Sequence, residues 1–548
     1  MKKMTRLIVC IVLLAAGVSC SNERSGSETG TPDIYPDPSV TRFTNLGFLG
    51  AEGYGLTRTL TLIDERNPDK PHYPGGVVIN AFQNGSLLEA AGLQTGDVVV
   101  QVAGDFLPSK ENPSWDMLKR MEAALSAGMD KIELGFWRKG KVHKASLDLS
   151  RAELPPLVPG NIQACERYRA AARKGISYLA GIQQDNGSFS VARSTPDSEL
   201  AVVSLAGLAF LASASLDEAD PYKENVKKCA EYIKAVLEAE KAGHLGGAYA
   251  FIFLSEYMDR THDMELMQRL VQIIPLIMEA QQEDGRWLLC EKEKEAALGY
   301  SEQTLATCLE LTALGCAERS GVIMSDNSPI EKACAFLKAR TQNGNVGYIP
   351  DPAFDRRSEA GRLAGVLFAM SAISCSYGDG YMQKLFTYYS DLSKEIPMAK
   401  MDEAVHLLSS ALLSRQKDLP QWCQFNEEHG VLLLSLQRLD GSFAELPKAD
   451  KREIPFYSDC QGEAWRASIY TLIFLLQEDA LPKFMVLHAS EVGVDRDSDG
   501  KRMEGASSMP GLPEGMDNLP PGAQTFTFTS EEEAMEVLKK MGIDQSST

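Results

Sequence analysis

The chain has 548 residues, of which 44% are hydrophobic, and a formal net charge of −20. A chain of this length and apolar content can bury several cores, which excludes general disorder and favours more than one domain. The negative charge excludes a nucleic-acid-binding protein, because no basic stripe offsets repulsion from phosphate.

The first 40 residues read as a targeting region. Three basic residues precede a short apolar run at 7–16, which is typical of a secretory signal and too short to span a bilayer. The run ends at Gly17-Val18-Ser19-Cys20, which resembles a bacterial lipoprotein cleavage site. That resemblance implies a signal peptide at 1–20, a lipidated Cys20 and a lipid anchor in the cell envelope. A plain secretory signal cut near Ser19 is the alternative. Residues 21–40 are rich in Ser, Gly and Pro and are expected to form a flexible tether.

Residues 41–151 carry the pattern of a small β-rich α+β domain. Strands are predicted at 76–81, 97–102 and 132–137, and a short helix before the second of them ends at Gly92. The Ala90-Ala91-Gly92-Leu93 helix end followed by Gly96-Asp97 resembles a PDZ domain.

A PDZ-like domain would bind an extended peptide as an added strand, with a loop of backbone amides capturing the C-terminal carboxylate. Leu46, Gly47 and Phe48 match that loop in type. The resemblance therefore implies that the partner is a protein or peptide C-terminus. If the long segment from Phe48 to Gly76 covers the groove, the domain is a spacer instead.

A worn repeat punctuates the rest of the chain. A helix ends at a glutamine, and a glycine four residues later is followed by an aromatic residue; the glycines of the copies are Gly187, Gly285, Gly344 and Gly441. Glycine is expected there because the helix end needs a positive φ, and the aromatic residue fixes the turn to its neighbour. Recurrence at a fixed period predicts stacked helical hairpins.

Six hairpins are predicted in a domain at 160–480, pairing 161–184 with 197–215, 221–241 with 246–260, 263–283 with 300–319, 328–341 with 356–375, 380–394 with 402–416 and 424–438 with 461–478. The second helix of each pair is the more apolar, as an inner ring inside an outer ring requires. The hairpins and their turns resemble the terpenoid cyclase and protein prenyltransferase superfamily, which implies an all-α (α/α)6 toroid. The expected fold is therefore multidomain: a PDZ-like domain followed by this toroid.

The cyclase resemblance also implies a candidate acid catalyst. Asp459-Cys460-Gln461-Gly462-Glu463 is similar to the D-C-x-x-E motif of oxidosqualene cyclases, in which the aspartate protonates the substrate. Asp459 and Glu463 are therefore candidate catalytic residues. The alternative is that Asp459 caps a helix and Cys460 is a buried thiol.

The inner helices offer a second candidate site. Five of them open with a small or capping residue followed by a glutamate or carry a glutamate in the first turn: Glu199, Glu302, Glu359, Glu403 and Glu463. Inner helices of a toroid run parallel, so these carboxylates would gather at one rim, where they could bind a ligand or act as general acid and base. Arg357 and nearby arginines could bind an anionic group there. The alternative is that each glutamate only complements the helix dipole.

The tail at 481–548 is acidic and rich in Gly and Pro, and a short helix is predicted near its end. Asp495, Asp497 and Asp499 begin like a calcium loop, but Ala506 stands where a bidentate glutamate belongs, so a turn is the alternative. The scattered histidines and cysteines have no metal-ligand spacing, so neither a zinc site nor another cofactor is expected.

Two functions follow from these patterns. The first is an envelope-anchored binding or scaffold protein, in which a peptide-binding module is joined to a toroid. The second is an enzyme that acts in the toroid cavity, either a polysaccharide lyase or hydrolase or a cyclase-like acid catalyst. An enzyme requires an open cavity with two carboxylates near each other, whereas a binding protein is compatible with an aliphatic inner face.

Overall fold

The computed structural model describes residues 44–56, 75–107, 113–155, 157, 165–191, 195–214, 216–217, 219–238, 244–288, 303–322, 326–341, 346, 356–373, 379–398, 403–445, 457–478 and 480–485. The described residues are mostly helical, with a small antiparallel sheet near the N-terminus. They all belong to a compact unit at 1–486, and a second unit spans 487–548.

The sheet has seven antiparallel strands among the described residues: β1 Thr44–Asn45, β2 Ala51–Leu56, β3 Gly76–Phe82, β4 Val98–Val102, β5 Asp105–Phe106, β6 Lys131–Arg138 and β7 Lys141–Asp148. The strand order is β1-β2-β3-β4-β6-β7, with β5 paired to β4. A helix, α2 (Pro113–Ser126), buries Met117 and Met121 in the same core as strand residues such as Val99 and Leu134. The short elements η1 (Gly47–Leu49), α1 (Leu87–Ala90) and η2 (Leu149–Ala152) complete this part.

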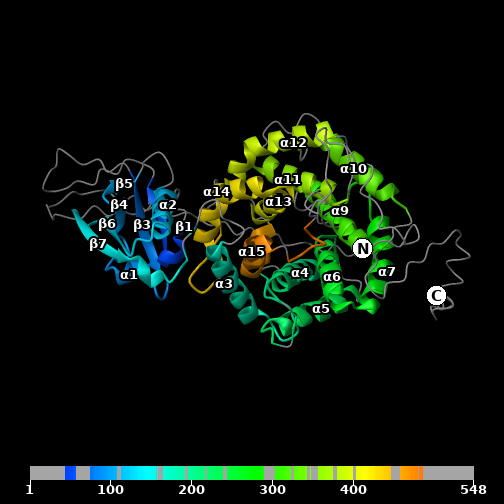
Figure 1. The fold of residues 1–548 in the computed structure, drawn as a ribbon, viewed down its shortest axis with the longest axis horizontal. Coiled ribbons are helices and arrows are strands. Elements are labelled where there is room, and N and C mark those ends of the chain that lie inside the picture. Colours follow the sequence, from blue (N-terminus) through cyan, green and yellow to red (C-terminus); the bar gives the residue numbers. More distant parts are fainter. Residues whose placement is uncertain are drawn as a thin grey trace, which may run out of the picture. The chain divides into compact units, whose positions relative to one another are not determined.

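The helices that follow alternate between an outer and an inner layer (Figure 1). The outer helices are α3 Glu166–Ile182, α5 Lys223–Glu238, α7 Met264–Glu279, α10 Ser328–Arg340, α12 Asp379–Leu392 and α14 Leu419–Leu436. The inner helices are α4 Pro196–Ser213, α6 His244–Thr261, α9 Gln303–Arg319, α11 Arg356–Ala372, α13 Glu403–Lys417 and α15 Tyr457–Leu475. Two 3-10 segments, η5 (Ser393–Met398) and η6 (Leu476–Glu478), follow α12 and α15.

The inner helices form a closed ring. Each contacts the next in chain order, from α4 through α6, α9, α11 and α13 to α15, and α15 contacts α4. An open spiral would lack the last contact. The arrangement is compatible with the expected toroid, and the alternation of layers makes the six inner helices parallel.

The burial of the helices explains the two layers. In α4 the run from Leu200 to Ala212 is buried on every side, because inner helices, the outer layer and the ring centre all surround it. By length and composition α4 could span a membrane, but most of it is enclosed by the protein, as in the core helix of a globular fold. In the outer helix α5 only Val226, Cys229, Ala230 and Ile233 are buried, which gives one apolar stripe.

The repeated turn holds neighbouring hairpins together. Gly187, Gly285 and Gly441 have φ between 87° and 91°, and a Cβ on any of them would lie 2.3 Å from a backbone oxygen of the next outer helix. For Gly441 that oxygen belongs to Lys174 of α3, so the last turn closes the ring onto the first helix. The glutamine of the same turn donates to another backbone oxygen of that helix region: Gln183 to Asn225, Gln281 to Pro329 and Gln437 to Ala171.

Substitution of Gly441 by alanine is expected to destabilise the protein by more than about 2 kcal/mol, because the new Cβ meets both an unfavourable φ and the Lys174 carbonyl. Denaturant unfolding of the full chain measures the change. The matched control is Gly181→Ala: Gly181 lies in α3 with open space around a Cβ, so alanine there should be neutral or slightly stabilising. Equal effects at both positions would contradict the role given to the turn.

The sheet and the ring share a polar and partly buried junction. Asn45 Nδ2 donates to the carbonyls of Ser435 and Gln437, 2.7 and 3.1 Å away, at the end of α14. Leu439 N donates to Gln83 Oε1 at 2.9 Å. Because these bonds satisfy backbone groups at the end of a helix, the sheet caps the ring at this point.

Candidate functional site

The N-terminal ends of the six parallel inner helices lie at one rim of the ring, which we call the acid rim. Two of its glutamates are placed, and each accepts a hydrogen bond from a tyrosine of the outer layer. Glu199 of α4 accepts from Tyr232 of α5 at 2.7 Å, and Glu463 of α15 accepts from Tyr178 of α3 at 2.9 Å. Each tyrosine follows a lysine by four residues, Lys174 and Lys228, so the two pairs are copies of one repeated interaction.

The two tyrosine–glutamate pairs also affect each other's protonation. Burial, with the adjacent Glu463 carboxylate as a smaller cause, raises the pKa of Tyr178 to about 12. The pKa of Tyr232 is raised further for the same reasons, with Glu199 as the neighbour. Both hydroxyls therefore stay protonated and donate at neutral pH. The side chain of Glu463 is 54% exposed, and Arg438 Nη1 lies 3.5 Å from its Oε1.

Arg438 connects the acid rim to the sheet. Its Nε lies 3.7 Å from Glu52 Oε1 on β2 while its Nη1 reaches Glu463 on α15. Glu52, Arg438, Glu463 and Tyr178 thus form a partly exposed polar cluster that starts in the sheet and ends in the outer ring.

The other predicted rim residues are only partly described. Glu302 lies outside the described residues. Glu359, Glu403 and Arg357 lie in α11 and α13, but their side chains are outside the description. The cap of α4 differs from the expectation. Thr195, not Ser198, caps the helix, and the two residues form a reciprocal capping box.

The candidate catalytic pair is interrupted by the backbone. Asp459 and Glu463 both lie in α15, but Gly462 between them has φ 79° and ψ −162°, which breaks the helix. The i, i+4 spacing therefore does not place the two carboxylates on one helical face. The side chain of Asp459 lies outside the description.

Buried cationic groups accompany the rim. Arg362 in α11 is 1% exposed, and Arg466 in α15 lies 3.2 Å from Glu445 Oε1. Burial, with Arg362 as a smaller cause, lowers the pKa of His406 in α13 to about 3. His406 is therefore neutral at any physiological pH. Trp465 of α15 and Tyr249 of α6 meet edge to face, with ring centroids 6.0 Å apart, although α4 separates their helices in the ring.

The predicted peptide-binding loop is occupied by the protein itself. Leu46 is fully buried and Phe48 is 7% exposed, and the Arg167 guanidinium lies 5.3 Å above the Phe48 ring. A Cβ on Gly47 would lie 3.0 Å from the Cα of Ser435 in α14. The loop thus packs against the end of α14, which leaves its backbone amides to serve the junction with the ring.

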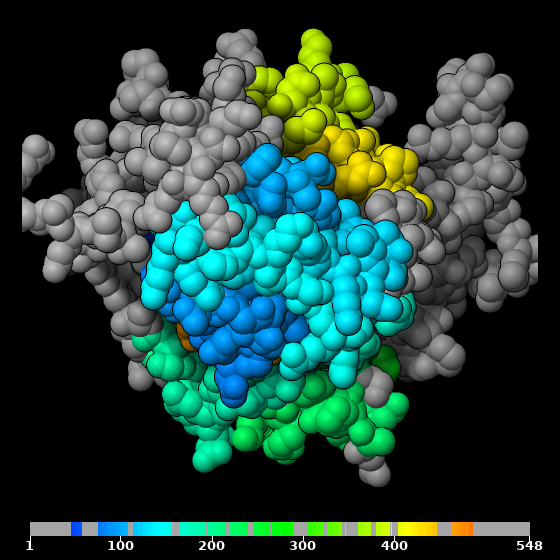
Figure 2. All heavy atoms as spheres, turned by 90° about the vertical axis from the view of Figure 1, so that its left-hand side faces the viewer, coloured from blue at the N-terminus to red at the C-terminus, as the bar shows by residue number. Residues whose placement is uncertain are grey.

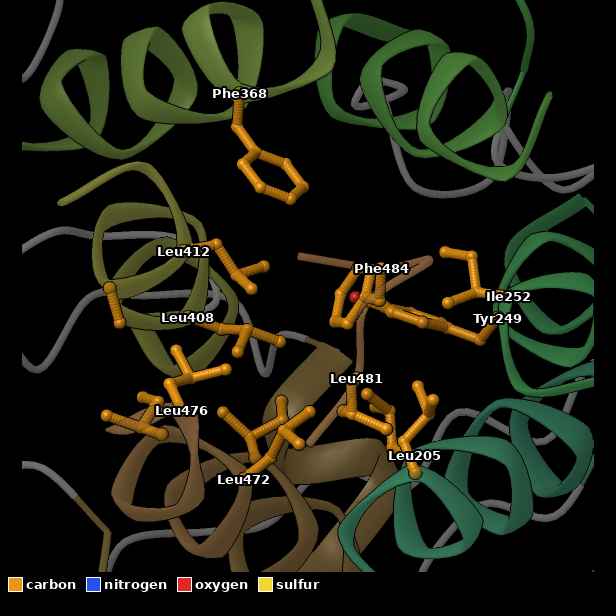
Figure 3. Packing of buried hydrophobic residues seen from close by; sticks show 14 of the residues in the cluster. Leu205, Tyr249, Ile252, Phe368, Leu408, Leu412, Leu472, Leu476, Leu481 and Phe484 are labelled. Carbon is orange, nitrogen blue, oxygen red and sulfur yellow. The ribbon is translucent and has the colours of Figure 1, made fainter. Parts of the chain in front are cut away.

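The centre of the ring is filled by side chains (Figure 3). Residues 476–478 and 480–485, which we call the plug, follow α15 and place Leu481 and Phe484 inside the ring, 1% and 2% exposed. Around them lie Leu205, Tyr249, Ile252, Phe368, Leu408, Leu412, Leu472 and Leu476. Phe484 and Phe368 meet edge to face at 6.0 Å between ring centroids.

Polar bonds fix the plug to the C-terminal ends of the inner helices, the rim opposite the acid rim. Arg319 of α9 donates from Nε to the Lys483 carbonyl at 2.8 Å, and Lys483 Nζ returns a bond to the Arg319 carbonyl at 2.9 Å. Lys483 also pairs with Asp259 at 3.1 Å, and Phe484 N donates to Glu256 of α6. This rim is therefore closed by the chain's own segment.

Glu256 should make the stability of the ring depend on pH. Burial raises the pKa of this fully buried carboxyl to about 7, although two backbone amides of the plug and Arg260 act in the opposite direction. The unfolded value is near 4.3. The folded state thus holds the extra proton between these values, and the contribution to stability falls as pH rises from about 4.5 to 7, by up to about 1.4 kcal/mol per unit.

Glu256→Gln should remove this pH dependence, because the amide still accepts from Phe484 but does not ionise. We expect the variant to match the wild type near pH 5 and to be the more stable protein at pH 8. Denaturant unfolding of both chains from pH 5 to 8 measures the difference. A constant difference across that range would show that Glu256 does not titrate in it.

Metal binding has no support among the described residues, where no group of three His, Cys, Asp or Glu side chains could hold an ion. The described cysteines are free, and all but Cys423 are buried. Cys20 and the calcium-like residues Asp495, Asp497 and Asp499 lie outside the described residues, so export and calcium binding stay predictions.

A family model described as a domain of unknown function (DUF6288) matches residues 170–474. No curated protein matches the chain. Two solved structures are similar, each titled a possible member of the GH105 family. The one from Klebsiella pneumoniae is 13% identical with a TM-score of 0.37, over 57% of this chain and 92% of that one. The one from Salmonella enterica is 12% identical with a TM-score of 0.38, over 57% and 93%.

These findings correct the resemblances drawn from the sequence. The matched family is neither the terpenoid cyclases nor the protein prenyltransferases, and the comparisons give no support to a PDZ domain or a lipoprotein. The glycine-and-aromatic turns reflect the packing of helical hairpins, which is not particular to those enzymes. Because the model covers more than half of the 548 residues, the chain belongs to the DUF6288 family.

Proposed function

We propose that the chain is an enzyme that binds a polysaccharide at the acid rim and cleaves it by hydrolysis, with Glu199 and Glu463 as the acid and base. The observation that carries this proposal is the pair of placed carboxylates on neighbouring inner helices, α4 and α15, each oriented by a tyrosine hydroxyl. Packed helices lie about 8–10 Å apart, and glycosidases place their two carboxyl groups about 5–9.5 Å apart.

The closed opposite rim supports the acid rim as the place where a ligand enters. The plug occupies the other end of the ring, held by Arg319, Asp259 and Glu256. The connections at the acid rim are also the longer ones: 280–302 and 437–456 there, against 262–263 and 418 at the plugged rim. Binding and catalytic residues concentrate on such connections, which a rigid scaffold positions.

The rim also has groups suited to holding a sugar chain. Arg438 and the tyrosine hydroxyls offer hydrogen-bond donors, and a cluster of this kind fixes the orientation of a polar ligand. Glu463 is exposed enough to meet a substrate, and Tyr178 keeps its proton and so holds the carboxylate in one position.

The test is release of reducing ends from a panel of neutral, acidic and amino polysaccharides by the full-length chain. Glu463→Gln and Glu199→Gln should each lower kcat about 100-fold or more, because a general acid or base contributes about 10²–10⁴. Tyr178→Phe should lower it less, since it only positions Glu463. Glu265→Gln is the control, because this exposed glutamate opens α7 at the opposite rim. Full turnover by both rim variants would overturn the proposal.

A second candidate, a non-catalytic binding protein, is favoured by the filled centre of the ring (Figure 3). Under this alternative the same panel would show binding without cleavage, and Glu463→Gln would weaken affinity but change no product. Measurement of binding and reducing ends on the same samples separates the two functions.

A further inference from the structure

Strand β7 (Lys141–Asp148) is the last strand of the sheet and has an open outer edge. It pairs with β6 along its whole length, and no other described strand pairs with it. Its residues from Lys141 to Lys144 are all exposed, and Val142 is 37% exposed although it is apolar. The atoms of this region lie on the surface that faces the viewer in Figure 2. An exposed edge of this length is a template for an added strand.

The hairpin geometry identifies the backbone groups that point outward. The two turn residues, Lys139 and Gly140, have φ of 48° and 76°, as in a two-residue type I′ turn. Such a turn makes Arg138 and Lys141 a hydrogen-bonded pair, and bonded and non-bonded pairs then alternate along the ladder. The N–H and C=O groups that face away from β6 are therefore those of Val142, Lys144 and Ser146.

The charge of the hairpin opposes that of the whole chain. Between 131 and 151 there are six basic residues and two acidic ones, in a protein of net charge −20. Arg138 is engaged by the buried Asp97 at 2.6 Å, and Lys144 meets Glu133 at 2.8 Å in an exposed pair that water screens. Lysines on an edge disfavour pairing with a second copy of the same strand and favour a strand of opposite charge.

We propose that the outer edge of β7 binds an extended acidic segment of a partner protein by strand addition, with Val142, Lys144 and Ser146 forming the backbone ladder. Main-chain bonds would supply the affinity, and Lys141 and Lys144 would select carboxylate side chains. This binding edge is separate from the acid rim and does not depend on the proposed catalysis. It also differs from the loop at 46–48, which the ring covers.

The probe is a labelled eight-residue peptide of alternating valine and glutamate, with a valine–lysine peptide as its counterpart, titrated against the full-length chain. We expect the acidic peptide to bind at least 10-fold more tightly than the basic one. Its binding should also slow hydrogen exchange at the amides of Val142, Lys144 and Ser146.

Two variants test the strand and the charge separately. Val142→Pro removes an outward N–H but no bond of the existing ladder, so the sheet should keep its thermal stability while binding falls at least 10-fold. Lys144→Glu should weaken the acidic peptide to a similar extent and strengthen the basic one, whether or not the proline variant folds. Lys227→Glu, on an exposed face of α5, is the control and should change neither. Undiminished binding by a folded Val142→Pro, or by Lys144→Glu, would overturn the proposal.

Discussion

Glu122→Ala is expected to destabilise the protein by about 3–5 kcal/mol, because it leaves the Arg167 guanidinium buried without its counter-charge. Arg167 Nη2 lies 2.8 Å from Glu122 Oε1, and both side chains are about 5% exposed. The pair joins α2 of the sheet to α3 of the ring, and Arg167 also covers Phe48. The loss of the carboxylate therefore weakens the junction as a whole.

Denaturant unfolding of the full-length chain measures this loss. The control is Glu133→Ala, which removes an equally short ion pair with Lys144 whose side chains are 52% and 70% exposed. An exposed pair contributes about 0–1 kcal/mol, so the control should barely change the free energy of unfolding. The double replacement Glu122→Leu with Arg167→Met should recover much of the loss, since no charge is left buried. Similar effects of Glu122→Ala and Glu133→Ala would contradict the importance of the junction.

Phe484→Ala should cost a similar amount, about 3–5 kcal/mol, because the side chain fills the middle of a closed ring. Phe484 is 2% exposed and packs against Phe368, and the surrounding helices are tied to each other on both sides (Figure 3). A ring constrained in this way cannot collapse around the missing phenyl group, so a cavity remains and the penalty is near the upper end of the range.

The unfolding free energy of Phe484→Ala is best compared with that of Pro482→Ala, an exposed position in the same plug. The control tests whether any change in the segment is harmful, and it should stay within about 0.5 kcal/mol of the wild type. If Phe484→Ala were equally mild, the plug would contribute little to the stability of the ring.

The hairpin ends could be predicted because their signals are local. The glutamine and glycine of each turn act within four residues, so Gly187, Gly285 and Gly441 mark helix ends before any tertiary contact is known. The uniformly apolar run in α4 likewise indicated an inner helix. Even the lysine–tyrosine spacing of Lys174 and Tyr178, repeated at Lys228 and Tyr232, is visible in the chain.

The partners of the predicted site residues could not be predicted, because they come from distant segments. Glu463 meets Tyr178 across 285 positions, and Phe484 N meets Glu256 across 228. The Leu46–Phe48 loop matched a peptide-binding pattern in type, but its use was decided by α14, about 390 positions away. The plug had only a weak signal, an apolar Leu481 and Phe484 after the last helix.

The sequence by itself determined a small β-rich part, a series of helical hairpins with glycine turns and a set of glutamates at the starts of inner helices. Periodicity and turn chemistry depend on neighbours within one or two helical turns, so one chain is enough to show them. Only the tertiary structure decided that the ring closes, that its centre is filled from the C-terminal side and that the placed rim glutamates are held by outer tyrosines. Those features depend on side chains that meet across the ring, where sequence separation gives no measure of distance.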